Sequence, residues 1–361
     1  MSKDPTPTTP ILAPEPLLAD LRQLISAARE SVARYVNQEL TLLHWDIGHR
    51  IQTELLNNER AEYGKQIVAT VSRQLTQEFG SGFNHRSVLH MIRFSESLPD
   101  REIVSTLSRL LSWSHFMEVI YLDDPLKRDF YIELSRINHW SVRTLRAKIQ
   151  GMLFERSALS SNTDEFIKKE IAILRDEDRM TTDMVFRDPY LLPFLGLSDS
   201  YSEEQLEDAI IREMEAFLLE IGDGFTFAAC QKKMPVGKKT YKLDLLLYHR
   251  KLRRLVAIEL KIGPFKPDYK GQMELYLRWL DKNEREQHEE APIGLILCSD
   301  AEPDEIELMG LDQGDIRVAR YITQTLPPTV LEKKLREIVS RNSELIARRE
   351  AMKQLESSGE E

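Results

Sequence analysis

The feature that most constrains this chain is the stretch 241–279, YKLDLLLYHRKLRRLVAIELKIGPFKPDYKGQMELYLRW. Residues 243–248 and 255–260 are short apolar runs rich in Leu, Ile and Val. The segment 249–254 between them is polar, basic and too short to be anything but a connection. A Gly/Pro break and a helical pattern follow the second run. The stretch therefore predicts a β-hairpin and then a helix.

The numbering of this hairpin brings two acids together. If the turn is centred between Lys251 and Leu252, Asp244 lies opposite Glu259. Directly opposed residues have Cβ atoms roughly 5 Å apart, and like charges placed that way destabilise a sheet unless a positive charge sits between them. Because side chains alternate along a strand, Lys261 shares the face of Glu259. We expect two carboxylates, an ammonium group and a divalent cation on this face.

These groups suit the hydrolysis of a phosphodiester. Mg²⁺ prefers hard oxygen ligands and keeps several waters, and Mn²⁺ is the alternative metal. Such an ion polarises a phosphoryl oxygen and lowers the pKa of a bound water. Lys261 could orient or deprotonate that water, or offset the charge that develops on phosphorus. The residues predict a metal-dependent nuclease.

Asp244 and the triplet Glu259-Leu260-Lys261 on a hairpin resemble the active-site signature of the PD-(D/E)XK nuclease superfamily. The wider run VAIELKIGPFKPDYKGQMELYL resembles the YhcG-type bacterial proteins that carry this nuclease domain. The likeness extends through FLLEIGDGF and DPYLLPFLGL, and through LLHWDIGHRI and LSWSHF in the helical half. A lone Glu-x-Lys carries little information, but this whole run is specific and the likeness covers nearly the whole chain.

The resemblance implies a role for each matching residue. Asp244 and Glu259 would be metal ligands, Leu260 would lend its backbone carbonyl to the metal, and Lys261 would be the catalytic lysine. On the following helix, the resemblance adds a Gln-x-x-x-Tyr element to the catalytic residues, and it consists of Gln272 and Tyr276. These two stand four residues apart, hence on one helical face.

The superfamily also often uses an acid on the helix before the sheet. The candidate metal ligand here is Glu215, within AIIREMEAFLLEIGDGF, and Glu220 is its rival. The chain departs from the superfamily pattern at Leu243, which stands where the name-giving proline would be.

The length of 361 residues predicts two domains. We expect a tail at 1–16, a helical domain at 17–160, a linker helix and joint at 161–200, the nuclease domain at 201–328 and a charged helix at 329–361. Strands are expected at 225–231, 292–300 and 315–322, beside the hairpin. The resemblance implies a restriction-endonuclease-like α/β fold, with a central mixed sheet flanked by helices, behind an all-α, helix-turn-helix-like domain.

The charge of the chain is unevenly distributed. The net charge is −10, yet residues 228–270 hold twelve basic and three acidic side chains around the predicted site. We expect these basic residues to form a phosphate-contacting rim on DNA. The alternative is that edge strands carry basic residues to prevent aggregation. The rim consists of Lys232, Lys233, Lys238, Lys239, Lys242, Arg250, Lys251, Arg253 and Arg254.

Two segments of the helical half resemble each other, because each has a helix, a break and a second helix that opens with Asn-His-x-Ser-Val near 84 and 138. One interpretation is a pair of helix-turn-helix units that approach DNA. The other is a domain for dimerisation or partner binding, since residues 1–160 carry equal numbers of acids and bases. The side chains that would reach DNA are His85, Arg86 and Arg93 from one unit and Arg143, Arg146 and Lys148 from the other.

Other sequence features concern location and partners. Cys230 and Cys298 form no disulfide framework, and no apolar run is long enough to cross a bilayer, so we expect a cytoplasmic protein without a membrane partner. A homodimer is one expectation, because cutting both strands of a duplex is simplest with two centres. The alternative function is a non-catalytic nucleic-acid-binding or assembly protein that retains the nuclease fold.

Overall fold

The structure is a computed structural model that describes residues 15–56, 61–157, 164–198, 200–311 and 314–324, and a few positions between 326 and 333. The expected tail and the expected C-terminal charged helix lie almost wholly outside these residues. The chain forms two compact units, one within residues 1–128 and 139–145 and the other within 129–138 and 146–361. No helix in the described ranges is long and apolar enough to span a membrane.

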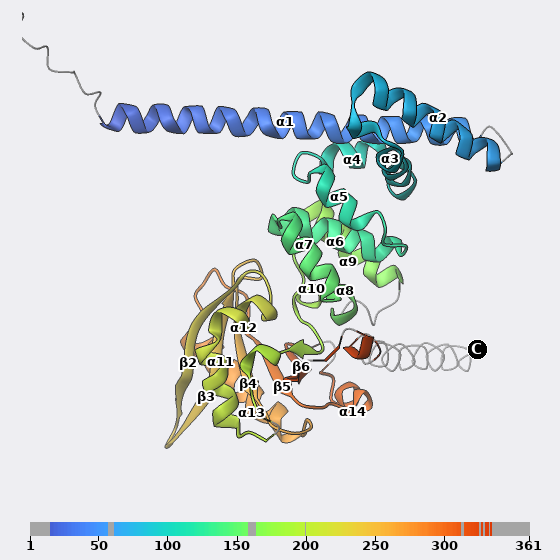
Figure 1. Cartoon of the computed structure of the whole chain (residues 1–361). Coiled ribbons are helices and arrows are strands. Elements are labelled where there is room, and N and C mark those ends of the chain that lie inside the picture. Colours follow the sequence, from blue (N-terminus) through green and yellow to red (C-terminus); the bar gives the residue numbers. More distant parts are fainter. Residues whose placement is uncertain are drawn as a thin grey trace, which may run out of the picture. The chain divides into compact units, whose positions relative to one another are not determined.

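The first unit is helical (Figure 1). Its elements are α1 (Glu15–Leu56), α2 (Ala61–Phe79), the 3-10 turn η1 (Ser81–Phe83), α3 (His85–Ser97), α4 (Arg101–Leu107) and α5 (Trp113–Val119). The closest packing joins α1 to α3 at Gly48, where an added Cβ would lie 1.9 Å from the carbonyl oxygen of Met91. Only glycine permits this approach of the two backbones.

The first of the two expected helix-turn-helix units consists of α2, η1 and α3, and Asn84 caps α3 by accepting a hydrogen bond from Ser87 N at 3.0 Å. In the second, α6 (Pro125–Asn138) is followed by α7 (Val142–Gln150). Two of the predicted DNA contacts are engaged within the chain, because Arg93 pairs with Asp123 at 3.0 Å and Lys148 lies 3.7 Å from Asp223. DNA binding by these helices stays a prediction.

The second unit is built on a six-stranded sheet (Figure 1) with the order β1-β6-β5-β4-β3-β2. The strands β2, β3 and β4 are antiparallel, while β4, β5, β6 and β1 run parallel. The strands are β1 (Tyr190–Leu191), β2 (Phe225–Val236), β3 (Lys239–His249), β4 (Arg254–Leu260), β5 (Ile293–Cys298) and β6 (Ile316–Ile322). The helical elements are α8 (Leu153–Arg156), α9 (Asp164–Glu177), α10 (Thr182–Val185), η3 (Pro193–Leu195), α11 (Glu203–Arg212), α12 (Met214–Ile221), α13 (Asp268–Asn283) and α14 (Pro303–Leu308).

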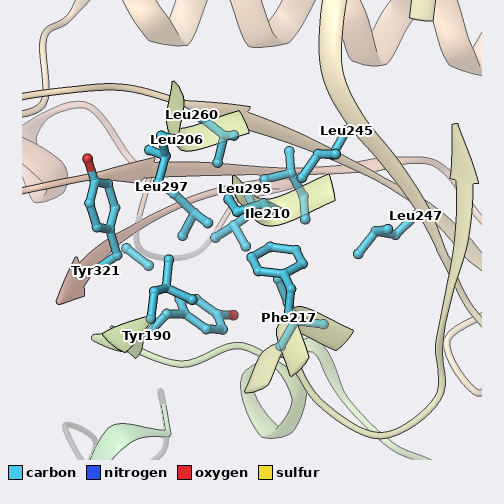
Figure 2. Close-up of a cluster of buried hydrophobic side chains, with 14 of the residues drawn as sticks. Tyr190, Leu206, Ile210, Phe217, Leu245, Leu247, Leu260, Leu295, Leu297 and Tyr321 are labelled. Carbon is cyan, nitrogen blue, oxygen red and sulfur yellow. The ribbon is translucent and has the colours of Figure 1, made fainter. Parts of the chain in front are cut away.

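Buried side chains cover both faces of the sheet. Figure 2 shows one cluster, in which Leu206 and Ile210 of α11 and Phe217 of α12 meet side chains of the central strands. On the opposite face, α13 contributes Met273 and Tyr276 to a second cluster. A mixed sheet with helices on both faces, preceded by a helical region, confirms the expected fold class.

Two details differ from the expectation. The single helix expected over 209–225 is interrupted at Glu213, whose φ of −102° and ψ of 33° separate α11 from α12. The apolar residues on both sides of the break pack into one cluster, namely Leu206, Ile210, Phe217 and Ile221. Their helical spacing continues through Glu213, so the sequence pattern gives no sign of the break. The short strand β1 was not expected, because two residues carry no periodic pattern.

Candidate active site

The hairpin of β3 and β4 has the expected register. Leu245 pairs with Ile258 and Leu246 with Ala257, which places Asp244 opposite Glu259 at the end of the ladder. At this point a side chain replaces a backbone carbonyl as the hydrogen-bond acceptor, because Leu260 N donates a hydrogen bond of 2.8 Å to Asp244 Oδ2. Asp244 is therefore fixed to the strand that carries Glu259.

Glu259 lies at the centre of the site and is only 4% exposed. Its Oε1 accepts hydrogen bonds from Lys261 Nζ and from Gln272 Nε2, both at 2.9 Å. Its Oε2 is buried and has no hydrogen-bond partner. A buried carboxylate oxygen without a partner is costly, and a bound cation would satisfy it.

Lys261 is held on three sides. Its Nζ pairs with Glu259, and its side chain is 12% exposed. Tyr321 donates a hydrogen bond of 3.1 Å to the carbonyl oxygen of Lys261, and Lys261 N donates one of 2.8 Å to Leu297 O. The ammonium group is thereby aimed at the carboxylates, with a small opening to solvent.

The helix α13 braces the site through the Gln-x-x-x-Tyr element. Gln272 Nε2 donates to Glu259 and also lies 2.5 Å from the hydroxyl of Tyr276. That hydroxyl donates a hydrogen bond of 3.0 Å to the carbonyl oxygen of Lys242 on β3. A chain of hydrogen bonds thus joins β4, α13 and β3 around Glu259.

The electrostatics of the site are dominated by two largely buried carboxyl groups that repel each other. Burial raises the pKa of Asp244, and the nearby acids Glu207 and Glu203 raise it further. Burial also raises the pKa of Glu259, with repulsion from Asp244 as the next cause, and these two effects outweigh the attraction of Lys261. The pKa of Lys261 is raised because Glu259 and the other acids outweigh its burial. The site has an excess of negative charge.

The structure does not bring the expected helix acid to this pair. Glu215 is exposed on α12, which the break at Glu213 separates from α11. Its rival Glu220 is held elsewhere, since its Oε1 lies 2.5 Å from Arg156 Nη1 and accepts a hydrogen bond from Leu191 N at 2.8 Å. We therefore replace Glu215 as the neighbouring acid by residues of α11.

Those residues are Glu203 and Glu207, one turn apart on α11. Glu203 Oε2 lies 3.8 Å from Lys261 Nζ. Both oxygens of Glu207 accept from Gln231 Nε2, at 2.7 and 2.6 Å, and Glu207 is only 9% exposed. The sequence held one signal for them: an acid that immediately follows the apolar Leu206 on a helix borders its buried face.

The predicted basic rim divides into two groups at opposite ends of β3. Lys233, Lys238, Lys239 and Lys242 are exposed near the Asp244 end. At the far end, Arg253 pairs with Glu290 and Arg254 with Asp315, both at 3.2 Å, and Lys251 binds the carbonyl oxygen of Ile137 at 2.8 Å. Arg250 is exposed at that same far end, and Lys232 pairs with Glu284 at 2.7 Å.

The donor set fits a hard divalent cation. The described residues include no group of three or more His, Cys, Asp or Glu side chains that could hold a metal. Mg²⁺ needs no such group, because one or two carboxylates suffice when waters and substrate oxygens complete its shell. Asp244 and the unpartnered Oε2 of Glu259 provide the two carboxylates.

Comparison with known proteins identifies two domain families in the chain. Residues 183–336 match the YhcG PDDEXK nuclease domain, and residues 20–156 match the DUF1016 N-terminal domain. A protein of Escherichia coli (strain K12) named "Putative nuclease YhcG" is 29% identical over 338 residues, which cover 85% of this chain and 86% of that protein. The chain belongs to the YhcG-type PD-(D/E)XK proteins.

The matched nuclease domain of this YhcG-type chain contains the whole acid pair, Lys261 and the bracing helix α13. A repair endonuclease from Pyrococcus abyssi, known as a crystal structure, is also similar, at 19% identity and a TM-score of 0.25, over 34% of this chain and 49% of that one.

Proposed function

We propose that this protein is a metal-dependent nuclease that hydrolyses phosphodiester bonds of DNA with an activated water. The observation that carries the proposal is the buried Oε2 of Glu259, which has no hydrogen-bond partner and lies on the acid opposed to Asp244. Opposed carboxylates of raised pKa repel each other, and a metal cation between them would favour their charged form.

Each residue has a role in this proposal. Asp244 and Glu259 would hold Mg²⁺, or Mn²⁺ in its place, together with the backbone carbonyl of Leu260. The bound ion supplies a water of lowered pKa and a charge that polarises the phosphoryl oxygen. Lys261 orients the attacking water or offsets the charge that develops on phosphorus. Gln272 and Tyr276 hold Glu259 in place through their hydrogen bonds.

The test is cleavage of labelled DNA by purified protein in Mg²⁺, in Mn²⁺ and in EDTA. We expect cleavage in either metal and none in EDTA. Asp244→Asn, Glu259→Gln and Lys261→Ala should each lower the rate by at least a hundredfold, since each removes a group that acts on the metal or the phosphate. Glu215→Gln, which removes an exposed acid outside the group, is the matched control and should cleave as the parent protein does.

Unchanged cleavage by the Asp244→Asn and Lys261→Ala variants would show that the site is elsewhere. DNA binding without cleavage in either metal would favour the alternative, a binding protein that retains the nuclease fold. The expected homodimer stays a prediction, which sedimentation of the protein with and without a DNA duplex would test.

A further inference from the structure

Two strands of the second unit continue beyond the rest of the sheet. Strand β4 ends at Leu260, whereas β2 and β3 stay paired from Lys232 opposite Leu243 to Val236 opposite Lys239. Gly237, with φ of 61°, and Lys238 form the turn between them. We name residues 231–242 the ribbon. Within it, four pairs from Lys233 opposite Lys242 to Val236 opposite Lys239 give a paired length of about 13 Å.

The ribbon is basic and contains no acid. Its twelve residues, QKKMPVGKKTYK, include five lysines. Lys232 is taken up by Glu284 at 2.7 Å. The other four, which we name the ribbon lysines, are exposed and make no ion pair with any part of the chain that the structure describes; they are Lys233, Lys238, Lys239 and Lys242. The ribbon thus presents uncompensated positive charge.

The pairing of the ribbon strands places two of these positive charges opposite each other. Lys233 lies directly opposite Lys242. Like charges in directly opposed positions destabilise a two-stranded sheet, and nothing in the described structure offsets this pair. A polyanion would remove the repulsion. Because Met234 and Tyr241 pack toward α13, alternation along the strands puts Lys233 and Lys242 on the opposite, outer face.

The ribbon is nevertheless rigid, because α13 braces it. Met234 is fully buried against side chains of α13. Trp279 Nε1 donates a hydrogen bond of 3.1 Å to the carbonyl oxygen of Pro235, and Tyr276 donates one of 3.0 Å to that of Lys242. The same hydroxyl of Tyr276 contacts Gln272, which holds Glu259. The ribbon is therefore fixed relative to the acid pair.

We propose that the ribbon enters the major groove of double-stranded DNA and that its lysines bind the phosphates on both sides of the groove. This inference rests on the proposed function for its choice of a nucleic acid as the ligand. The major groove of B-form DNA is about 12 Å wide and accepts a two-stranded ribbon, whereas the undistorted minor groove, at about 6 Å, is too narrow for one.

Single strands and RNA duplexes fit the ribbon less well. Proteins that bind single strands stack the bases on exposed aromatic side chains. The aromatic groups at the ribbon serve as supports instead, since Tyr241 packs edge-on against Tyr276 and Trp279 is tied to Pro235. The major groove of an RNA duplex is deep and too narrow to be entered. A DNA duplex is the substrate that remains.

The test measures binding without cleavage, on the full chain in EDTA, by fluorescence anisotropy with a DNA duplex, an RNA duplex and a single strand of one sequence. The ribbon variant carries Lys233→Gln, Lys238→Gln, Lys239→Gln and Lys242→Gln. Each phosphate contact contributes about 0.9 to the slope of log affinity against log salt, so we expect the slope to fall by about 3 to 4. Affinity for the DNA duplex at ~0.1 M salt should fall at least tenfold.

The charge-matched control neutralises four exposed basic residues outside the ribbon, through Lys168→Gln, Lys169→Gln, Arg212→Gln and Lys282→Gln, and should keep the parent slope to within about one. A second variant carries only Lys238→Gln and Lys239→Gln, at the turn, where no packing is disturbed. Its salt slope should fall by about half as much as that of the four-lysine variant. Methyl green, which occupies the major groove, should compete with the parent protein, and the minor-groove ligand distamycin should not.

An unchanged slope in both ribbon variants, or an equal loss in the control, overturns the proposal. Equal affinity of the parent protein for the RNA duplex overturns the choice of groove. These outcomes are separate from those of the proposed function. If duplex DNA binds through the ribbon but is not cleaved, only the proposed nuclease activity is contradicted. If cleavage is normal and the ribbon lysines have no effect on binding, only the role of the ribbon is contradicted.

Discussion

Gln272 on α13 donates a hydrogen bond of 2.9 Å to Oε1 of Glu259 on β4. The same oxygen accepts from Lys261, so the orientation of the Glu259 carboxylate is fixed from two sides while its Oε2 keeps no hydrogen-bond partner. A carboxylate held in this way is organised for a ligand before that ligand arrives.

Replacing Gln272 should weaken metal binding more than it harms the chemistry. Gln272→Ala removes a partner that orients a ligand, and such losses reduce metal affinity by about ten- to a hundredfold. We expect the Mg²⁺ concentration for half-maximal cleavage to rise by that factor, with most of the rate restored at saturating Mg²⁺. Glu259→Gln should not be rescued by Mg²⁺. A Gln272→Ala protein with the parent Mg²⁺ dependence would remove Gln272 from the site.

Neutralising Glu259 should stabilise the metal-free protein. The pKa of Glu259 is raised by burial and by Asp244, so the folded state favours an uncharged side chain at this position. Glu259→Gln should therefore raise the free energy of unfolding in urea, at pH 8 with EDTA, by about 1 kcal/mol or more. The exposed Glu215→Gln is the control and should leave it unchanged. A less stable Glu259→Gln protein would contradict the excess of negative charge at the site.

His249 should make the protein sensitive to acid. It is fully buried at the end of β3, where Leu252 N donates a hydrogen bond of 3.0 Å to its Nδ1, and burial lowers its pKa to about 4. A histidine with a lowered folded pKa contributes stability that is fully present above ~6.5 and is lost as the pH falls toward 4. The loss should reach about 3 kcal/mol in urea unfolding.

The matched variant for this prediction is His249→Gln, because an uncharged amide has no proton to take up. Its free energy of unfolding should be lower at pH 7 and should fall less steeply than that of the parent between pH 6.5 and 4. Parallel curves for the two proteins would show that groups other than His249 cause the acid sensitivity.

The contact between α1 and α3 should fail when Gly48 gains a side chain. The Cβ of Gly48→Ala would lie 1.9 Å from Met91 O and 2.3 Å from Met91 C, both backbone atoms that cannot rotate away. We expect a destabilisation of about 3 kcal/mol or more in the helical unit, measured by urea unfolding with tryptophan fluorescence. Gly82→Ala, with no atom within 4 Å of the added Cβ, is the control and should cost little.

The amino-acid sequence by itself determined the hairpin and its opposed acids. The polar turn at 250–253 is short, and the length of a hairpin loop sets the register of its strands, which here brings Asp244 to Glu259. The spacing of Gln272 and Tyr276 likewise placed them on one helical face. These relationships are local, within about forty residues of chain, and local geometry leaves them few alternatives.

Only the tertiary structure decided which distant groups join the site. It brought Glu203 and Glu207 there in place of Glu215, because a break that leaves the apolar period intact turns one helix into two. The tertiary structure also divided the basic residues into two groups, because they lie at opposite ends of β3. Those at one end are mostly paired within the chain, and those at the other are mostly exposed. Contacts between segments far apart in the chain depend on how helices pack against the sheet, and residue types and spacings alone do not specify that packing.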